Sequence, residues 1–298
     1  MSVLAVTGGT GFVGGHLLGQ AVAAGHHVRA LVRRPQPDRL GVEWIAGALD
    51  DPAALDRLVA GADAVIHIAG AVNAPDRAGF AHANIAGTRA VLAAAVAADT
   101  ARFVHVSSLS VREPGLSDYG WSKAEAEALV RAAPLAWSIV RPPAIYGPGD
   151  RDMLELFRMA QRGLVLLPPA GRFSVIAAED LARLLLTMLA AYTHAVIEAD
   201  DGTPHGWDHR DFARLLGTVL DRRVLPVPVP GALMALGARV DRLVRGPRAR
   251  LTPDRVGYMR HPDWVARGPL PAGPWRPLVA TPDGLRATAA WYRAHGWL

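Results

Sequence analysis

The chain has 298 residues, and its 51% hydrophobic content excludes a disordered polypeptide. It contains no cysteine, which excludes disulfides, thiolate metal sites and a cysteine nucleophile. The formal net charge is +5, and Lys123 is the one lysine among 32 lysine and arginine residues. The densest basic patch, residues 242–255, has no interleaved aromatic residue for base stacking, so no nucleic-acid partner is expected.

Targeting signals and membrane spans are not predicted. No segment has the roughly 18 uncharged apolar residues of a membrane span. The first residues run straight into a strand pattern with no cationic prelude or cleavage site, so they do not resemble a signal peptide. These features favour a cytoplasmic protein.

The first half of the chain alternates short apolar strands with longer helical patterns. The apolar strands lack a polar alternation, which is typical of strands buried on both faces. This rhythm predicts an α/β fold with a doubly wound parallel sheet. The predicted strands are residues 3–7, 28–32, 42–46, 64–69, 103–107 and 137–140, and the predicted helices are 12–24, 52–60, 84–98 and 122–132.

After about residue 141 proline and glycine become dense and the alternation loosens. We expect helices over residues 153–162, 180–191, 211–220 and 231–244, and a return to the sheet at residues 196–199. The predicted organisation is a sheet domain over residues 1–150 and a smaller cap over residues 151–298. The cap is interleaved with the sheet domain, to which segments near residues 175–200 return.

A glycine-rich turn lies between the first predicted strand and the first predicted helix. Gly8, Gly11 and Gly14 give a G-x-x-G-x-x-G spacing. Such glycines allow a tight turn, a close backbone approach to a pyrophosphate and packing of helix on strand, while the helix N-terminus offers N–H groups to an anion. We therefore predict dinucleotide binding rather than a plain turn, with contacts from Gly8, Thr10, Gly11, Phe12 and Val13.

The region after the second predicted strand indicates which dinucleotide binds. An NAD site usually has an acidic residue about 20 positions after the glycine turn, where it accepts the ribose hydroxyls. No Asp or Glu occurs between Gly14 and Asp38, and Arg33 and Arg34 follow the strand instead. Because a guanidinium suits a 2′-phosphate, we favour NADP over NAD. Two solvated arginines are the alternative interpretation.

Tyr119 and Lys123 form a Tyr-x-x-x-Lys that opens a predicted helix, and this spacing places both side chains on one helix face. The ordinary pKa of tyrosine is about 10, and a cation one turn away favours the phenolate. Ser107 is the last residue of the fifth predicted strand, and Ser108 and Ser110 follow it, at the strand end where parallel sheets present ligand-facing residues. A hydroxyl there can stabilise charge that develops on a carbonyl oxygen. Taken singly, both patterns are common.

Together these features resemble the short-chain dehydrogenase/reductase superfamily in its extended branch. Further motifs stand in the expected order: HIAG at residues 67–70, NIAGT at 84–88, VSSLS at 106–110 and RPPAIYGPGD at 141–150. The resemblance implies a Rossmann fold with a smaller C-terminal cap that binds the substrate. It also implies an NAD(P)-dependent enzyme.

The resemblance assigns roles to the matching positions. Tyr119 is expected to be the general acid/base, and Lys123 to hold the nicotinamide ribose and lower the tyrosine pKa. Ser108 is the expected serine for polarising a carbonyl, with Ser110 as the alternative. Asn84 is expected to support the sheet–helix junction rather than the chemistry. Other cofactor contacts are expected from Leu49, Asp50, Ala69, Gly70, Pro142 and Ile145.

Two departures from the family pattern affect the site. The family often has Gly-Asp-Leu after the third strand, whereas this chain reads Gly47-Ala48-Leu49-Asp50, so an acidic adenine contact depends on Asp50. The interval between Ser108 and Tyr119 is short, which predicts a trimmed substrate entrance. No metal site is expected, because the histidines show no ligand spacing with carboxylates.

The substrate is expected to be a small molecule that is apolar or bears a carbonyl. RPPAIYGPGD and a proline-led apolar helix over residues 226–244 resemble the 3β-hydroxysteroid dehydrogenase and dihydroflavonol reductase side of the superfamily. One face of that helix fits an apolar substrate cap, core packing or a membrane-surface contact. That face comprises Leu233, Met234, Leu236, Val240, Leu243 and Val244.

The favoured function is NADPH-dependent reduction of a ketone or aldehyde, or the reverse oxidation of the alcohol. A nucleotide-sugar epimerase or dehydratase is the first alternative. A catalytically silent dinucleotide-binding protein is the second, although such relatives tend to lose the Tyr-x-x-x-Lys pair that this chain keeps. The sequence leaves the substrate, the reaction direction and the choice between monomer and homodimer open.

Overall fold

The computed structural model describes residues 2–246, 249, 251–267 and 273–298, so Arg248 and Arg250 of the basic patch lie outside the described residues. The chain forms two compact units. Unit 1 comprises Met1–Pro142, Ala178–Glu198 and Pro271–Arg276. Unit 2 comprises Pro143–Ala177, Ala199–Leu270 and Pro277–Leu298. The chain first passes from unit 1 to unit 2 after Pro142, whereas the sequence predicts the domain boundary at residue 150.

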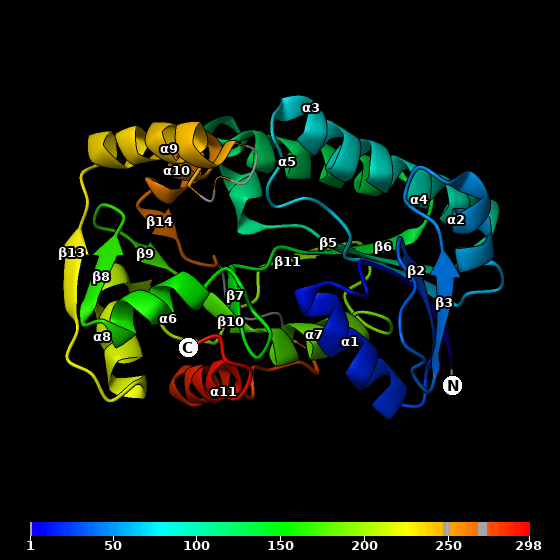
Figure 1. The fold of residues 1–298 in the computed structure, drawn as a ribbon. Coiled ribbons are helices and arrows are strands. Elements are labelled where there is room, and N and C mark those ends of the chain that lie inside the picture. Colours follow the sequence, from blue (N-terminus) through cyan, green and yellow to red (C-terminus); the bar gives the residue numbers. More distant parts are fainter. Residues whose placement is uncertain (1, 247–248, 250, 268–272) are drawn as a thin grey trace. The chain divides into compact units, whose positions relative to one another are not determined.

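Unit 1 is built on a seven-stranded parallel sheet (Figure 1). The strand order β11-β6-β5-β4-β1-β2-β3 reverses direction between β1 and β4, as in a Rossmann fold, and confirms the predicted doubly wound sheet. Ligands of such sheets bind outside the carboxyl ends of the strands at this reversal. The strands are β1 (Val3–Thr7), β2 (His27–Val32), β3 (Val42–Ala46), β4 (Ala64–His67), β5 (Arg102–Val106), β6 (Ala136–Val140) and β11 (Ala195–Ile197).

Helices cover both faces of this sheet, which explains why its central strands are buried on both faces. Helices α1 (Phe12–Ala23) and α7 (Ala178–Thr187) lie on one face. Helices α2 (Pro52–Val59), α4 (Gly87–Ala97) and α5 (Asp118–Ala132) lie on the other, with a core that includes Leu55, Val91, Phe103, Val130 and Ile139. Every residue of β4 and β5 is buried.

The third helical segment of unit 1 begins earlier than predicted. Helix α3 (Arg77–Phe80) continues into a π-helical turn (Ala81–Ala86) and then into α4, so helical backbone starts at Arg77 rather than at Asn84. By length and composition alone, Arg77–Ala97 is apolar enough to cross a membrane, with a mean hydropathy of 1.2. Its most apolar window is 44% buried, and Val91 and Ala95 belong to the core of unit 1.

Within its described residues, unit 2 combines short two- and three-stranded sheets with five helices. Tyr146, Phe157, Phe212 and Tyr292 anchor its core. The strand pairs are β7 (Ala144–Tyr146) with β10 (Val175–Ala177), β8 (Leu164–Leu167) with β13 (Leu225–Pro228), and β9 (Arg172–Phe173) with β12 (Trp207–Asp208) and β14 (Asp263–Trp264). The helices are α6 (Leu154–Gln161), α8 (His209–Val219), α9 (Gly231–Arg245), α10 (Pro253–Met259) and α11 (Thr281–Ala294).

The proline-led segment before α9 corrects one prediction. Residues 226–230 are not helical: Leu225–Pro228 forms β13, paired in parallel with β8. Proline supplies no N–H to a helical hydrogen bond, so the three prolines at 226, 228 and 230 disfavour a helix before Gly231. The interpretation that the apolar face of α9 packs in the core is also wrong for most of its side chains. Met234 is buried, but the other five side chains of this face are exposed.

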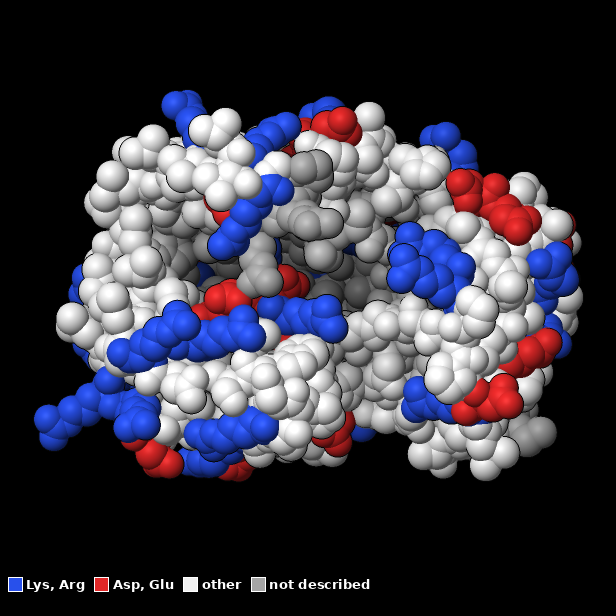
Figure 2. Space-filling view, viewed as in Figure 1, with Lys and Arg blue, Asp and Glu red and all other residues white. Residues whose placement is uncertain are grey.

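Basic side chains are spread over the face of the molecule shown in Figure 2. In the face shown, arginines lie over several elements of both units, interspersed with acidic and uncharged residues. Lys123 is buried instead, with an exposed fraction of 5%, and Arg102 is similarly buried at 8%.

Candidate active site

The glycine turn of unit 1 is built for close backbone approach. Gly8 has a φ of +77°, and the Gly11 N–H donates to the Gly8 carbonyl oxygen at 3.0 Å. A Cβ on Gly14 would lie 2.1 Å from the Gly8 oxygen, and one on Gly8 would lie 2.7 Å from the Ala69 nitrogen. Gly11, the N-cap of α1, has no side chain to occupy the first helical N–H groups. These N–H groups are therefore available to an anion.

The predicted adenine-end residues lie on the surface of the same unit. Arg33 and Arg34 are exposed just after β2. Asp50 is also exposed, and the neighbouring Asp51 caps α2 by accepting from the Ala54 N–H at 3.0 Å. Leu49 is half-buried and lies against Gly87, where an added Cβ would come within 2.7 Å of its Cδ1.

Tyr119 lies in the first turn of α5. The helix begins at Asp118 because Ser117 caps it, accepting from the Gly120 N–H at 2.9 Å. A Cβ at Gly120 would lie 2.9 Å from the Ser110 carbonyl oxygen, so this first turn sits directly against the 3-10 helix Leu109–Arg112. The serine segment after β5 is thereby held beside the turn that carries Tyr119.

The two candidate serines differ in their surroundings. Ser108 is half-buried and caps the 3-10 helix, accepting from the Ser110 N–H at 3.2 Å. A hydroxyl that accepts in this way keeps its own proton for donation to another oxygen. The Ser110 hydroxyl is buried and has no hydrogen-bond partner among the described residues.

Lys123 lies one turn after Tyr119 and is buried beneath the strand ends. Its Nζ donates to the Val106 carbonyl oxygen at 2.7 Å, at the last residue of β5. A Cβ on Gly70 would come within 3.8 Å of this Nζ, which places the turn after β4 next to the ammonium. Burial lowers the pKa of Lys123 to about 8, although the charge of Glu127 acts in the opposite direction.

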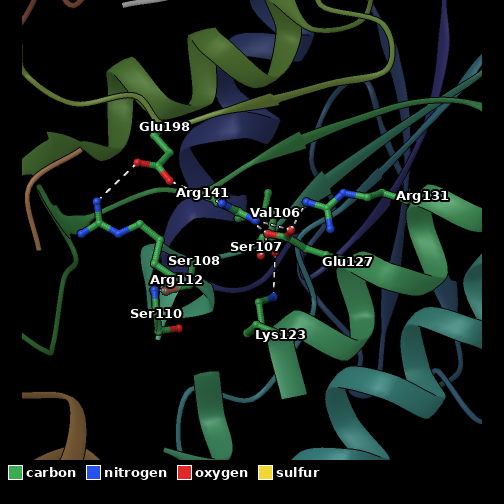
Figure 3. Close-up of polar contacts among 10 residues, drawn as sticks. All are labelled: Val106, Ser107, Ser108, Ser110, Arg112, Lys123, Glu127, Arg131, Arg141 and Glu198. Atoms are coloured by element: carbon green, nitrogen blue, oxygen red, sulfur yellow. Dashed lines mark hydrogen bonds and ion pairs between the residues drawn. The ribbon is translucent and has the colours of Figure 1, made fainter. Parts of the chain in front are cut away.

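Glu127 continues the same helix face one turn further and is the centre of a buried ion-pair network (Figure 3). Its Oε1 accepts from Ser107 Oγ at 2.6 Å and from Arg141 Nε at 2.8 Å, and its Oε2 accepts from Arg141 Nη2 at 2.8 Å. Arg131 adds a further bond at 2.6 Å. Burial alone would raise the pKa of Glu127, but these hydrogen bonds and the arginine charges outweigh it and lower the pKa.

This network joins three elements that border the site. Ser107 follows β5, Arg141 follows β6, and Glu127 belongs to α5. Arg141 also pairs with Glu198 at 3.4 Å, and Glu198 pairs with Arg112 at 3.6 Å (Figure 3). The rotation of α5, and with it the direction of Tyr119 and Lys123, is therefore set against the ends of both strands.

Asn84 holds the π-helical turn against the loop after β4. Its Oδ1 accepts from the Ala71 N–H at 2.7 Å, and its Nδ2 donates to the Ala71 oxygen at 3.0 Å. The same Nδ2 donates to Ser122 Oγ at 2.8 Å, and Ser122 Oγ donates to the Tyr119 oxygen at 2.8 Å. Asn84 thus connects the loop that carries Gly70 with the first turns of α5.

Two stacked histidines lie below this layer. The ring of His67 lies 5.3 Å from that of His105, and His67 also bonds Thr7 at 2.7 Å and Thr88 at 3.0 Å. Burial, with the charge of Lys123, lowers the pKa of His67 to about 3, and the pKa of His105 also lies well below its usual range. Both rings are therefore neutral at physiological pH.

Comparison with known proteins identifies the family. A family model described as NAD(P)H-binding matches residues 8–191, a span that starts at Gly8 and includes Tyr119 and Lys123. The chain belongs to this NAD(P)H-binding family. Its relatives and structural neighbours place it with the extended short-chain dehydrogenase/reductase enzymes, so the predicted enzyme class is confirmed.

Three similar proteins illustrate this placement. The chain is 40% identical to the ceramide reductase of Caulobacter vibrioides, over 99% of this chain and 96% of that protein. It is 37% identical to the 2-alkyl-3-oxoalkanoate reductase of Stenotrophomonas maltophilia, over 53% of this chain and 54% of that protein. The crystal structure of UDP-glucose 4-epimerase from Thermotoga maritima shares the fold, with a TM-score of 0.75, 19% identity and coverage of 99% of both chains.

Unit 1 of this NAD(P)H-binding enzyme brings most of the predicted residues together. The glycine turn contacts Ala69, Gly70 lies by Lys123, and the Pro142 oxygen accepts from the Leu109 N–H at 3.1 Å. Ile145 lies in β7 of unit 2. Sequence reasoning missed Glu127, although its position four residues after Lys123 continues the Tyr119–Lys123 spacing and was the available signal.

Proposed function

We propose that the protein is an NADPH-dependent reductase that acts on a carbonyl group of a long-chain lipid of the ceramide class. The observation that carries the chemistry is the buried ammonium of Lys123, one helical turn after Tyr119. This ammonium lies between the Val106 oxygen and the turn at Gly70. The lipid class is supported by the 40% identity to a ceramide reductase along almost the whole chain.

In the proposed reaction NADPH, when bound, would supply the hydride that the carbonyl carbon receives. Tyr119 donates its phenolic proton to the carbonyl oxygen, so the ketone becomes a secondary alcohol. Ser108 donates a hydrogen bond to the same oxygen while negative charge develops on it. Lys123 would hold the nicotinamide ribose, and its positive charge would stabilise the phenolate that Tyr119 becomes after it donates its proton.

The glycine turn and the two arginines after β2 support the cofactor assignment. The N–H groups at the start of α1 would hold the pyrophosphate. Arg33 and Arg34, both exposed and without an ion pair among the described residues, would bind the 2′-phosphate. Titration calorimetry should show tighter binding of NADPH than of NADH, and Arg33→Ala should reduce that difference. Arg89→Ala, an exposed arginine on α4, is the matched control. Equal affinities in the wild type would contradict the assignment.

The mechanism is tested by Tyr119→Phe in an assay of NADPH oxidation with a keto lipid of the ceramide class. Loss of the acid/base group should lower kcat by roughly 10²–10⁴-fold while NADPH binding is retained. Ser108→Ala should lower kcat more than Ser110→Ala. Unchanged turnover in Tyr119→Phe would refute the assigned role of this residue.

The same assay separates the proposal from an epimerase, an activity named in one of the structural neighbours. An epimerase uses its cofactor transiently. Cofactor that survives purification, together with conversion of a nucleotide sugar and no net NADPH consumption, would favour that alternative. The reductase proposal requires one NADPH oxidised for each alcohol formed.

A further inference from the structure

Helix α9 of unit 2 has two faces with opposite surroundings. Its inner face places Met234 and Ala238 in a buried cluster with Val256 of α10. An apolar stripe on a surface helix normally faces a core. The stripe on the outer face of α9 instead points away from that cluster, with exposed fractions between 51% and 85%. This outer face consists of Leu233, Leu236, Val240, Leu243 and Val244.

Basic side chains border the outer face. Arg239 lies three positions after Leu236 and four before Leu243, so it neighbours both on the helix surface. Arg242 is exposed in the last turn, while Asp241, the one acidic residue of the helix, pairs with Arg245 at 3.2 Å. Figure 2 shows blue side chains beside a white surface where Figure 1 places α9. The helix therefore presents an apolar stripe with positive charge at its edge.

We propose that the outer face of α9 docks on the surface of a membrane that contains anionic lipids. A helix with an apolar stripe and flanking arginines lies in the plane of the bilayer interface, with its apolar side chains at the acyl boundary and its cations at the headgroups. The 15 residues of α9 are too few to cross the hydrocarbon core, which needs about 20 apolar residues. The charge complementarity selects an anionic surface over an uncharged apolar partner.

This inference deepens the proposed function and rests on its lipid substrate. A long-chain lipid resides in a bilayer, so an enzyme held at the surface meets a far higher local concentration of it than one in bulk water. Met234 and Ala238 keep α9 fixed to unit 2 while the outer face is free to contact lipid.

The test is flotation of the purified protein with vesicles, scored without any turnover. Phosphatidylcholine vesicles that contain phosphatidylglycerol should carry the protein upward, and pure phosphatidylcholine vesicles should carry much less. Binding should fall as salt is raised, because the electrostatic part is screened. Leu243→Asp should weaken binding by about tenfold or more, since it removes an apolar anchor and adds a repelled charge. Leu40→Asp is the matched control, because Leu40 is 92% exposed on unit 1 and should leave binding unchanged.

A second variant tests the electrostatic part of membrane binding independently of the apolar side chains. Arg239→Glu should weaken binding to the anionic vesicles by roughly tenfold or more, because the reversal changes two unit charges near the surface. Arg293→Glu, an exposed arginine on α11, carries the same charge change and should have a smaller effect. Circular dichroism checks that each variant is folded.

Three results would overturn the inference. The first is a wild type that does not float with anionic vesicles, and the second is equal binding by Leu243→Asp and wild type. The third is a wild-type dimer that Leu243→Asp converts to a monomer, which would make the outer face a contact between two copies of the chain. Failure of the proposed function looks different: no keto lipid is reduced even in detergent, while flotation is unaffected. If only the membrane inference fails, reduction of a short-chain soluble analogue persists.

Discussion

Replacing Lys123 by methionine should separate the stability of the fold from its activity. Methionine has similar length and no charge, so it removes the ammonium from a site where the exposed fraction is 5%. The pKa of Lys123 falls from 10.5 to about 8 on folding because of burial. At about 1.4 kcal/mol per pKa unit, keeping this group charged at pH 7 costs the folded state about 3 kcal/mol. Lys123→Met removes this cost, but it also loses the hydrogen bond to the Val106 oxygen, which offsets roughly 1–3 kcal/mol of the stability gained.

The two opposing effects predict that Lys123→Met is as stable as the wild type at pH 7, or more stable by roughly 1 kcal/mol. The pH dependence has a definite sign. Between pH 8 and 10.5 the unfolded chain holds a proton on Lys123 that the folded chain has released, so the stability of the wild type rises with pH across this range. The variant lacks this titration.

Urea denaturation of both proteins at pH 7, 8, 9 and 10 measures the difference, without added cofactor, since a bound cofactor would stabilise the folded state by mass action. The difference in unfolding free energy between the two proteins at each pH cancels the contributions of the other titrating groups. The wild type should gain on the variant by about 2–3 kcal/mol from pH 7 to pH 10. A constant difference across this range, or a variant that is several kcal/mol less stable at pH 7, would refute the assignment of a costly buried ammonium.

Activity should change in the opposite direction. The proposed role of Lys123 requires a charge next to Tyr119, so Lys123→Met should reduce NADPH-dependent turnover as strongly as Tyr119→Phe does, by roughly 10²–10⁴-fold. A more stable protein with much lower turnover would show that the ammonium is retained for chemistry at the expense of stability. Full turnover in Lys123→Met would exclude this role.

Three further variants test the packing around the sites. Gly14→Ala should abolish NADPH binding in calorimetry, because its Cβ would meet the Gly8 oxygen at 2.1 Å. The Cβ of Gly15→Ala meets open space, so this variant should bind NADPH and gain up to ~1 kcal/mol of stability. Equal behaviour of the two variants would contradict the geometry. Glu127→Gln removes the buried carboxylate that Arg141 bonds with two nitrogens and leaves Arg141 only the pair with Glu198 at 3.4 Å. The change should cost up to about 3–5 kcal/mol in urea denaturation, while the exposed Glu125→Gln should cost little. Burial raises the pKa of Asp150 in unit 2 from 3.8 to about 6, so the wild type should gain on Asp150→Asn as pH falls from 7 to 4, and a flat difference would exclude this titration.

The parallel sheet was predictable because its strands are short, apolar and punctuated by glycine and proline. The strands predicted at residues 3–7 and 42–46 match the observed bounds, and the others differ at their ends by one or two residues. The strand after residue 64 ends at His67 rather than at residue 69, because its pairing with β1 ends where β1 ends, at Thr7, and Ala69 then lies against Gly8. That contact joins residues about sixty positions apart, which no local pattern encodes.

The π-helical turn at Ala81–Ala86 shows a similar limit. The sequence there has helical composition, and its extra backbone residue is stabilised by Asn84, whose side chain bonds both the N–H and the oxygen of Ala71. Such a turn depends on a tertiary partner rather than on propensity. Local reasoning could place Asn84 in a helix and near the junction, but could not find the turn itself.

The distribution of the cations in unit 1 gives a physical reason for a lone lysine. Arg141 bonds Glu127 with two nitrogens, and Arg102 at the start of β5 spreads its guanidinium over several acceptors, including the Met188 and Leu189 oxygens and Ser138 Oγ. A planar fork with five N–H groups suits such surroundings. Lys123 bonds one backbone oxygen at the end of β5, and Gly70 lies close to its Nζ. A compact ammonium therefore fits where a planar guanidinium would not. Lys123→Arg should therefore fail to restore the activity that Lys123→Met loses, even though it restores the charge.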